Sequence, residues 1–94
     1  MQCNSLEEVR ENIDQIDRQI IHLLAQRGGF VNQASRFKKD TNEVKAPNRV
    51  EAIIEKVKGL AIEEGIDAGL VESVYRTMIS EFIGLEMKEF QSER

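Results

Sequence analysis

Apolar residues recur along the first third of the chain at steps of three and four positions. The series consists of Leu6, Val9, Ile13, Ile16, Ile20, Leu23, Phe30, Ala34 and Phe37. This spacing places the side chains on one face of an α-helix. Ser5 and Glu8 have the spacing of a capping box, in which hydroxyl and carboxylate satisfy free backbone N–H groups of the first turn. The pattern therefore predicts a helix that begins at about residue 6.

Two consecutive glycines, Gly28 and Gly29, interrupt this helix. Each glycine in a helix interior costs about 1 kcal/mol relative to alanine, so the chain could turn here and form a hairpin. The alternative is one helix that continues to about Lys39 because packing outweighs the penalty. We favour the continuous helix because the apolar stripe keeps its phase across the pair.

Two further helices are expected after a loop over residues 40–46, where the period is lost. Pro47 suits the first position of the second helix, since its missing N–H is no loss there. Gly65 is placed to end that helix in the left-handed conformation, and Asp67 is the expected N-cap of the third. The second helix has an apolar face of Val50, Ile53, Ile54, Val57, Leu60 and Ala61. The stripe of the third consists of Val74, Met78, Phe82 and Leu85.

The length of the first helix predicts an oligomer. A helix over residues 6–39 is about 50 Å long, whereas a compact chain of 94 residues is roughly 30 Å across. An overhanging helix with an apolar stripe needs a second chain to cover it. We expect an all-α fold: a three-helix protomer with a very long first helix, one domain over residues 1–94 with a core at about 6–90, paired as an obligate homodimer with two-fold symmetry.

Composition removes several classes of function. The chain has 13 Lys and Arg against 17 Asp and Glu, a net charge of −4, which argues against nucleic-acid binding. One Cys and one His allow neither a disulfide framework nor a Cys/His zinc site. No window is apolar enough to span a membrane, and the first residues lack the pattern of an export signal. We therefore expect a cytoplasmic protein without metal or cofactor.

Four cations are the first candidates for a site. Arg27 and Lys38 are eleven residues apart, which on one helix places them on the same face about 16 Å from each other. Arg49 opens the second helix. Arg10 lies about 25 Å before Arg27 and roughly 100° around the helix, so it could complete the site only from a partner chain. Arginine binds carboxylates bidentately, so such a cavity would suit a small dianionic organic acid.

Glu86 is the fifth candidate, because apolar residues surround it at helical spacing: Ile79, Phe82, Ile83 and Phe90. Burial there favours the protonated carboxyl group, which can donate a hydrogen bond, while nearby cations favour the ionised form. All five charged residues also have an ordinary explanation as long side chains at helix edges or as surface ion pairs. His22 and Cys3 lack the partners that nucleophilic catalysis requires.

The ordered set of these segments resembles the all-helical AroQ class of chorismate mutases, and within it the isochorismate-pyruvate lyase branch. The resemblance covers about residues 6–90. Its segments are Leu6-Glu7-Glu8-Val9-Arg10, Ile13-Asp14-Gln15-Ile16-Asp17, Leu24-Ala25-Gln26-Arg27, Ala34-Ser35-Arg36-Phe37-Lys38, Ala46-Pro47-Asn48-Arg49-Val50 and Gly65-Ile66-Asp67-Ala68.

The resemblance implies an interlocked dimer with two active sites. Arg27, together with Arg10 of the partner chain, would bind the substrate carboxylates. Lys38 would contact a carboxylate and the ether oxygen of the breaking bond, and Arg49 would line the same pocket. Protonated Glu86 would be a second donor to that oxygen. Both reactions of the family are pericyclic and need no nucleophile, since the protein holds a reactive conformer and stabilises negative charge on the oxygen.

Departures from the family pattern keep three functions open. Val50 and Ile83 stand where efficient bacterial mutases have Glu and Ser, and apolar residues there are more like the lyase. Glu86 differs in turn from the Gln typical of the lyase, and Gly28-Gly29 is unusual in the long helix. The hypotheses are a chorismate mutase that forms prephenate, an isochorismate-pyruvate lyase that forms salicylate and pyruvate, and a noncatalytic helical dimer that binds a partner.

Overall fold

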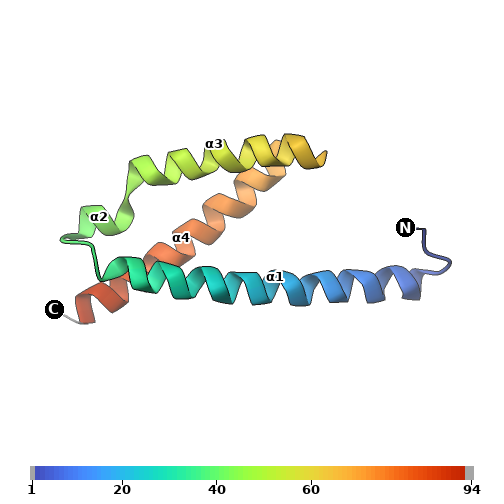
Figure 1. Ribbon diagram of the computed structural model, residues 1–94, viewed down its shortest axis with the longest axis horizontal. Coiled ribbons are helices and arrows are strands. Elements are labelled where there is room, and N and C mark those ends of the chain that lie inside the picture. Colours follow the sequence, from blue (N-terminus) through green and yellow to red (C-terminus); the bar gives the residue numbers. More distant parts are fainter. Residues whose placement is uncertain (1, 93–94) are drawn as a thin grey trace. The chain divides into compact units, whose positions relative to one another are not determined.

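The chain is all-α, as predicted. A computed structural model describes residues 2–92, in which four helices and no strand are present. They are α1 (Leu6–Ser35), α2 (Thr41–Lys45), α3 (Pro47–Glu64) and α4 (Ala68–Ser92) (Figure 1). The chain divides into two compact units, the first up to Phe30 and the second from Val31. No helix in the described part is both long and apolar enough to cross a membrane.

Helix α1 begins where the capping residues predicted. The N–H of Glu8 donates to the Ser5 hydroxyl at 3.1 Å. The Glu8 carboxylate accepts from the N–H of Asn4 at 3.2 Å, one residue before the expected donor. The helix then runs through Gly28 and Gly29 without a break (Figure 1). The interpretation of a continuous helix is confirmed, and the hairpin alternative is wrong.

The end of α1 was predicted too late. The helix ends at Ser35 rather than Lys39, so its 30 residues span about 45 Å. The next three N–H groups, of Arg36, Phe37 and Lys38, donate to carbonyl groups three residues back, at 3.2, 3.0 and 3.3 Å. Such bonds tighten the last turn and satisfy its free carbonyl groups, which ends the α-helical ladder.

The predicted loop over residues 40–46 contains the short helix α2. Asp40 is its N-cap, since the carboxylate accepts from the N–H of Glu43 at 2.9 Å. The Glu43 carboxylate in turn accepts from the N–H of Lys39. This reciprocal pair is a capping box that contains Asp in place of Ser or Thr. Val44, 1% exposed, anchors α2 in the core of the second unit, and α2 packs on α4.

Ala46 connects α2 directly to α3. Its φ of 40° and ψ of 59° are left-handed, a conformation that costs a residue with a Cβ about 1 kcal/mol. The N–H of Ala46 donates to the carbonyl of Asn42 at 2.9 Å, which closes α2. Pro47 then occupies the first position of α3, as predicted. Ala46 is therefore the one residue between α2 and α3.

Helices α3 and α4 form a hairpin whose turn follows the predicted signals (Figure 1). Gly65 has a φ of 72° and ends α3 in the left-handed conformation. Asp67 accepts from the N–H of Leu70 at 2.9 Å, so it caps α4. The buried apolar residues of the second unit are Val44, Ile54, Val57, Ala61, Ile79 and Phe90.

The stripe predicted for α4 is partly wrong. Val74 and Leu85 are 55% and 61% exposed, whereas the buried residues of α4 are Ile79, Glu86 and Phe90. Met78 and Phe82 of the predicted stripe are half-buried, so because α4 has apolar residues on more than one face, the spacing alone did not select the most deeply buried one. The expected burial of Glu86 is nevertheless confirmed.

The apolar stripe of α1 is uncovered in the single chain. The residues of this stripe that are at least 39% exposed are Leu6, Val9, Ile13, Ile16, Ile20, Leu23 and Phe30. Large apolar side chains in a continuous row are uncommon on the surface of a stable monomer. This row is the surface that the predicted homodimer would cover.

Candidate active site

Lys38 and Glu86, the two predicted catalytic residues, are in direct contact. The Nζ atom of Lys38 lies 2.9 Å from both Oε1 and Oε2 of Glu86. The Glu86 side chain is only 3% exposed, whereas that of Lys38 is 24% exposed. The second unit thus contains an ion pair whose carboxylate is buried and whose ammonium reaches solvent.

Two different elements bring this pair together. Lys38 lies in the turn after α1, where its N–H donates to the carbonyl of Ser35. Glu86 lies on the buried face of α4, between Ile79 and Phe90. Since Lys38 is outside the helix, the expected 16 Å spacing from Arg27 along one helix face is wrong.

Arg49 and Lys38 line the same hollow in the surface of the second unit. This hollow has a volume of about 440 Å³. The other residues that line it come from the turn after α1, from α2 and from the start of α3: Phe37, Asn42, Glu43, Ala46, Pro47 and Asn48. Two cations in one open hollow provide a site for a carboxylate group. The left-handed turn at Ala46 places the start of α3, and with it Arg49, at this hollow.

The two apolar site candidates lie next to these polar residues in the chain. Val50, half-buried, follows Arg49 on α3. Ile83, also half-buried, precedes Glu86 by one turn of α4, so both project from the same side of that helix. Their proximity to a bound substrate stays a prediction.

Arg10 and Arg27 belong to the first unit, on α1. Arg10 is exposed and Arg27 is half-buried. They are separated by seventeen residues of continuous helix, so the expected separation of about 25 Å along α1 holds. Their roles as carboxylate ligands stay predictions.

Within residues 2–92 there is no cluster of three His, Cys, Asp or Glu side chains that could hold a metal ion. The site of the second unit instead offers an ammonium, a guanidinium and a carboxyl group. The ammonium and the guanidinium bind anions and donate hydrogen bonds. They can stabilise negative charge that develops on an oxygen atom of a bound molecule.

Sequence reasoning missed two features of the second unit. The amides of Asn42 and Asn48 line the hollow, and no local pattern distinguishes them from ordinary loop residues. Arg76 forms ion pairs with Glu51 and Glu72. The spacing of Glu72 and Arg76, four residues apart on one helix, is a signal that could have indicated half of this network.

Comparison with known proteins places this chain in a family. Residues 9–87 match the family described as chorismate mutase type II. The isochorismate pyruvate lyase of Pseudomonas aeruginosa is 36% identical over 92 residues, which cover 98% of this chain and 91% of that protein. The chorismate mutase of Methanocaldococcus jannaschii is 25% identical over 79% of this chain and 76% of its own length.

A third relative, the T-protein of Haemophilus influenzae, is 33% identical over 82% of this chain but only 21% of its own length. The all-helical fold and these matches define one class of protein. The chain belongs to the chorismate mutase type II family. The resemblance to the AroQ class is therefore confirmed.

Proposed function

We propose that the chain is an enzyme that stabilises the transition state in which the ether bond of chorismate, or of a closely related acid, breaks. The observation that carries this proposal is the contact between Lys38 and buried Glu86, close to a hollow that Arg49 also lines. An ammonium donates to an oxygen atom, and a carboxyl group does so in its protonated form. Preorganised donors of this kind each contribute on the order of 10²-fold or more to a rate.

Substrate binding would change the partners of Lys38. Its ammonium donates to both oxygens of Glu86. An anionic substrate would compete with Glu86 for this ammonium. The reaction itself is pericyclic and needs no nucleophile or base.

The substrate carboxylates would be bound by arginines. The resemblance to the family proposes Arg27 and Arg49 as these ligands, together with Arg10 of a partner chain. Support for a partner comes from the exposed apolar stripe of α1, which a second copy would cover. In this dimer each site contains residues of both chains.

The conversion of chorismate to prephenate is the reaction that we propose first. It breaks the ether C–O bond and forms a C–C bond in one step. The Glu86 carboxyl group supports it, since the lyase branch typically has Gln at this position. A second candidate is the cleavage of isochorismate to salicylate and pyruvate. Support for it comes from the apolar Val50 and Ile83 and from the relative that is 36% identical over nearly the whole chain.

Incubation of the pure protein with chorismate and, separately, with isochorismate distinguishes these activities. Prephenate from chorismate is the expected result for the mutase, whereas salicylate and pyruvate from isochorismate would assign the lyase. Turnover of both substrates would mean that one pocket serves both reactions. No turnover of either substrate would contradict the proposed function and leave a noncatalytic helical dimer as the remaining hypothesis.

A further inference from the structure

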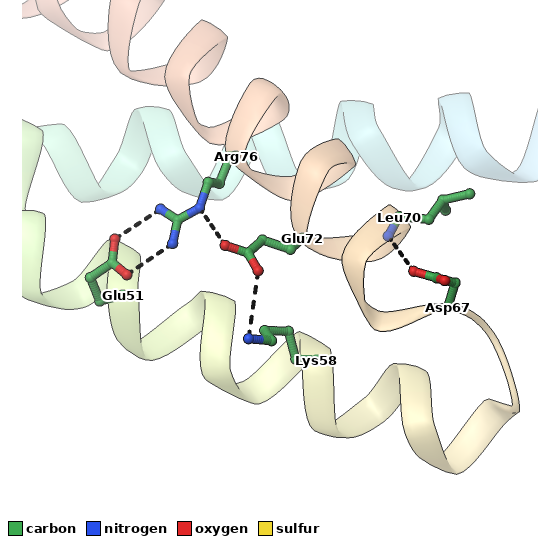
Figure 2. Close-up of polar contacts among 6 residues, drawn as sticks. All are labelled: Glu51, Lys58, Asp67, Leu70, Glu72 and Arg76. Atoms are coloured by element: carbon green, nitrogen blue, oxygen red, sulfur yellow. Dashed lines mark hydrogen bonds and ion pairs between the residues drawn. The ribbon is translucent and has the colours of Figure 1, made fainter.

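A network of four charged side chains joins α3 to α4 (Figure 2). The guanidinium of Arg76 on α4 donates to both oxygens of Glu51 on α3, at 2.9 and 3.0 Å. Its Nε atom donates to Glu72, one turn earlier on α4, at 2.8 Å. Glu72 also pairs with Lys58 of α3, at 3.5 Å. One arginine therefore holds a carboxylate from each helix.

Each charged group among Arg76, Glu51 and Glu72 favours the ionised form of its partners. The hydrogen bond from Arg76 is the main cause that lowers the pKa of Glu51, and the same guanidinium lowers that of Glu72. The two carboxylates raise the pKa of Arg76. All three groups therefore stay charged at neutral pH. The two parallel hydrogen bonds from Arg76 to Glu51, here called the fork, fix the direction of this contact as well as its distance. An apolar contact fixes no direction.

The network lies close to the candidate site in the chain. Glu51 follows Arg49 by two residues, within the first turns of α3. The first fully buried residue of α3 is Ile54, whereas Val50 and Ile53 before it are half-buried and the Glu51 side chain is 63% exposed. Packing alone therefore holds the beginning of α3 less firmly than its middle. The fork from Arg76 is the directional contact that ties this beginning to α4.

We propose that Arg76 is a positioning residue that fixes the first turns of α3 against α4 and thereby sets the place of Arg49 in the hollow. Arg76 itself lines no part of that hollow. The inference rests on the proposed function only for the role of Arg49 as a carboxylate ligand. A ligand of this kind binds the ground state and the transition state alike, so its displacement raises KM more than it lowers kcat.

Steady-state kinetics with chorismate or isochorismate, whichever the protein turns over, test the proposal. We expect Arg76→Met and Glu51→Gln each to raise KM by about threefold while kcat changes little, because exposed ion pairs have modest effects. Arg76→Lys keeps the charge but loses the fork, and should resemble Arg76→Met. The control is Lys58→Met, which removes a cation of the same network but leaves the fork intact, and should match the wild type.

A double variant separates positioning from general stability. If Arg76 acts through Arg49, then Arg76→Met should have no further effect on KM in a chain that already contains Arg49→Met. Additive effects, or equal effects of Arg76→Met and Lys58→Met, would overturn the proposal. A fall in kcat with unchanged KM would overturn it as well.

Hydrogen exchange tests the same inference without a substrate. The N–H of Val50 donates to the carbonyl of Ala46 at 3.0 Å and is the first amide of α3 whose bond the fork should protect. We expect its exchange to be about threefold faster in Glu51→Gln than in Lys58→Met, because local opening becomes easier. Equal exchange in the two variants would contradict the positioning role, even if the wild type turned over neither substrate. Faster exchange in an inactive protein would instead contradict only the proposed function.

Discussion

Replacement of Lys38 by methionine removes the ammonium group that faces Glu86 and leaves a buried carboxylate without it. The Glu86 side chain is 3% exposed, so water cannot replace the lost partner well. Loss of one member of a fully buried ion pair costs about 3–5 kcal/mol. Lys38 is 24% exposed, and water can reach the vacated side. We therefore expect Lys38→Met to lower the free energy of unfolding by about 2 kcal/mol.

A double variant distinguishes a buried charge from lost packing. In Lys38→Met combined with Glu86→Gln, no uncompensated charge is left, so the double variant should be more stable than Lys38→Met alone. The matched control is Lys39→Met, which removes the neighbouring, exposed lysine. Its effect should lie within about 0.5 kcal/mol of zero.

Urea unfolding followed by circular dichroism measures these differences. All variants are compared at one protein concentration, because the stability of a dimer depends on concentration. The reasoning would be refuted if Lys38→Met were as stable as Lys39→Met. It would also be refuted if the double variant were less stable than Lys38→Met, since the cost would then not come from the charge of Glu86.

Three further predictions concern the donor, the partner and the ion-pair network. If Glu86 donates a hydrogen bond in the site, Glu86→Gln should keep most of the activity because its amide also donates, whereas Glu86→Ala should lower kcat by about 10²-fold; wild-type activity of Glu86→Ala would contradict the donor role. Sedimentation should show a dimer at micromolar concentration, and Ile16→Glu on the exposed stripe of α1 should abolish it, whereas a wild-type monomer would contradict the proposed assembly. The pKa of Glu51 is lowered in the folded chain from its ordinary value of 4.5. The ionised Glu51 therefore contributes to stability above pH 4.5, and this contribution is lost as pH falls through the pKa of the folded chain. The difference in urea midpoint between wild type and Glu51→Gln should shrink on acidification to about pH 3.

The parts of the fold that the sequence predicted correctly depend on local chemistry. Pro47, Gly65 and Asp67 each have a conformational or hydrogen-bonding property that is fixed by the residue type. The stripe of α1 could be followed through Gly28-Gly29 because its period extends over many residues. These signals need no knowledge of what packs against them.

The errors arose where very short local motifs or tertiary contacts decide the structure. The end of α1 at Ser35 and the helix α2 depend on tight turns and a capping box at Asp40 that are only a few residues long. The buried face of α4 could not be selected from spacing, because apolar residues such as Val74 and Leu85 also occur on its exposed side.

In the candidate site, too, local sequence predicted some features and contacts between distant residues decided others. Glu86 was found because a carboxyl group among apolar residues is unusual at helical spacing. Its contact with Lys38 joins residues 48 positions apart, and no pattern within a short stretch of sequence predicts such a contact. The resemblance to the family supplied both residues as members of one site, and the structure shows them within 2.9 Å. The fork of Arg76 on Glu51 was missed because it also joins two helices.

The central claim is that Lys38 stabilises the charge that develops on the ether oxygen during the reaction. The most direct test is kcat of Lys38→Ala, with Lys39→Ala as the control, for whichever of chorismate and isochorismate the wild-type protein turns over. The account predicts a decrease in kcat of about 10²-fold or more for Lys38→Ala and a nearly unchanged value for Lys39→Ala. A kcat of Lys38→Ala close to that of the wild type would contradict the account.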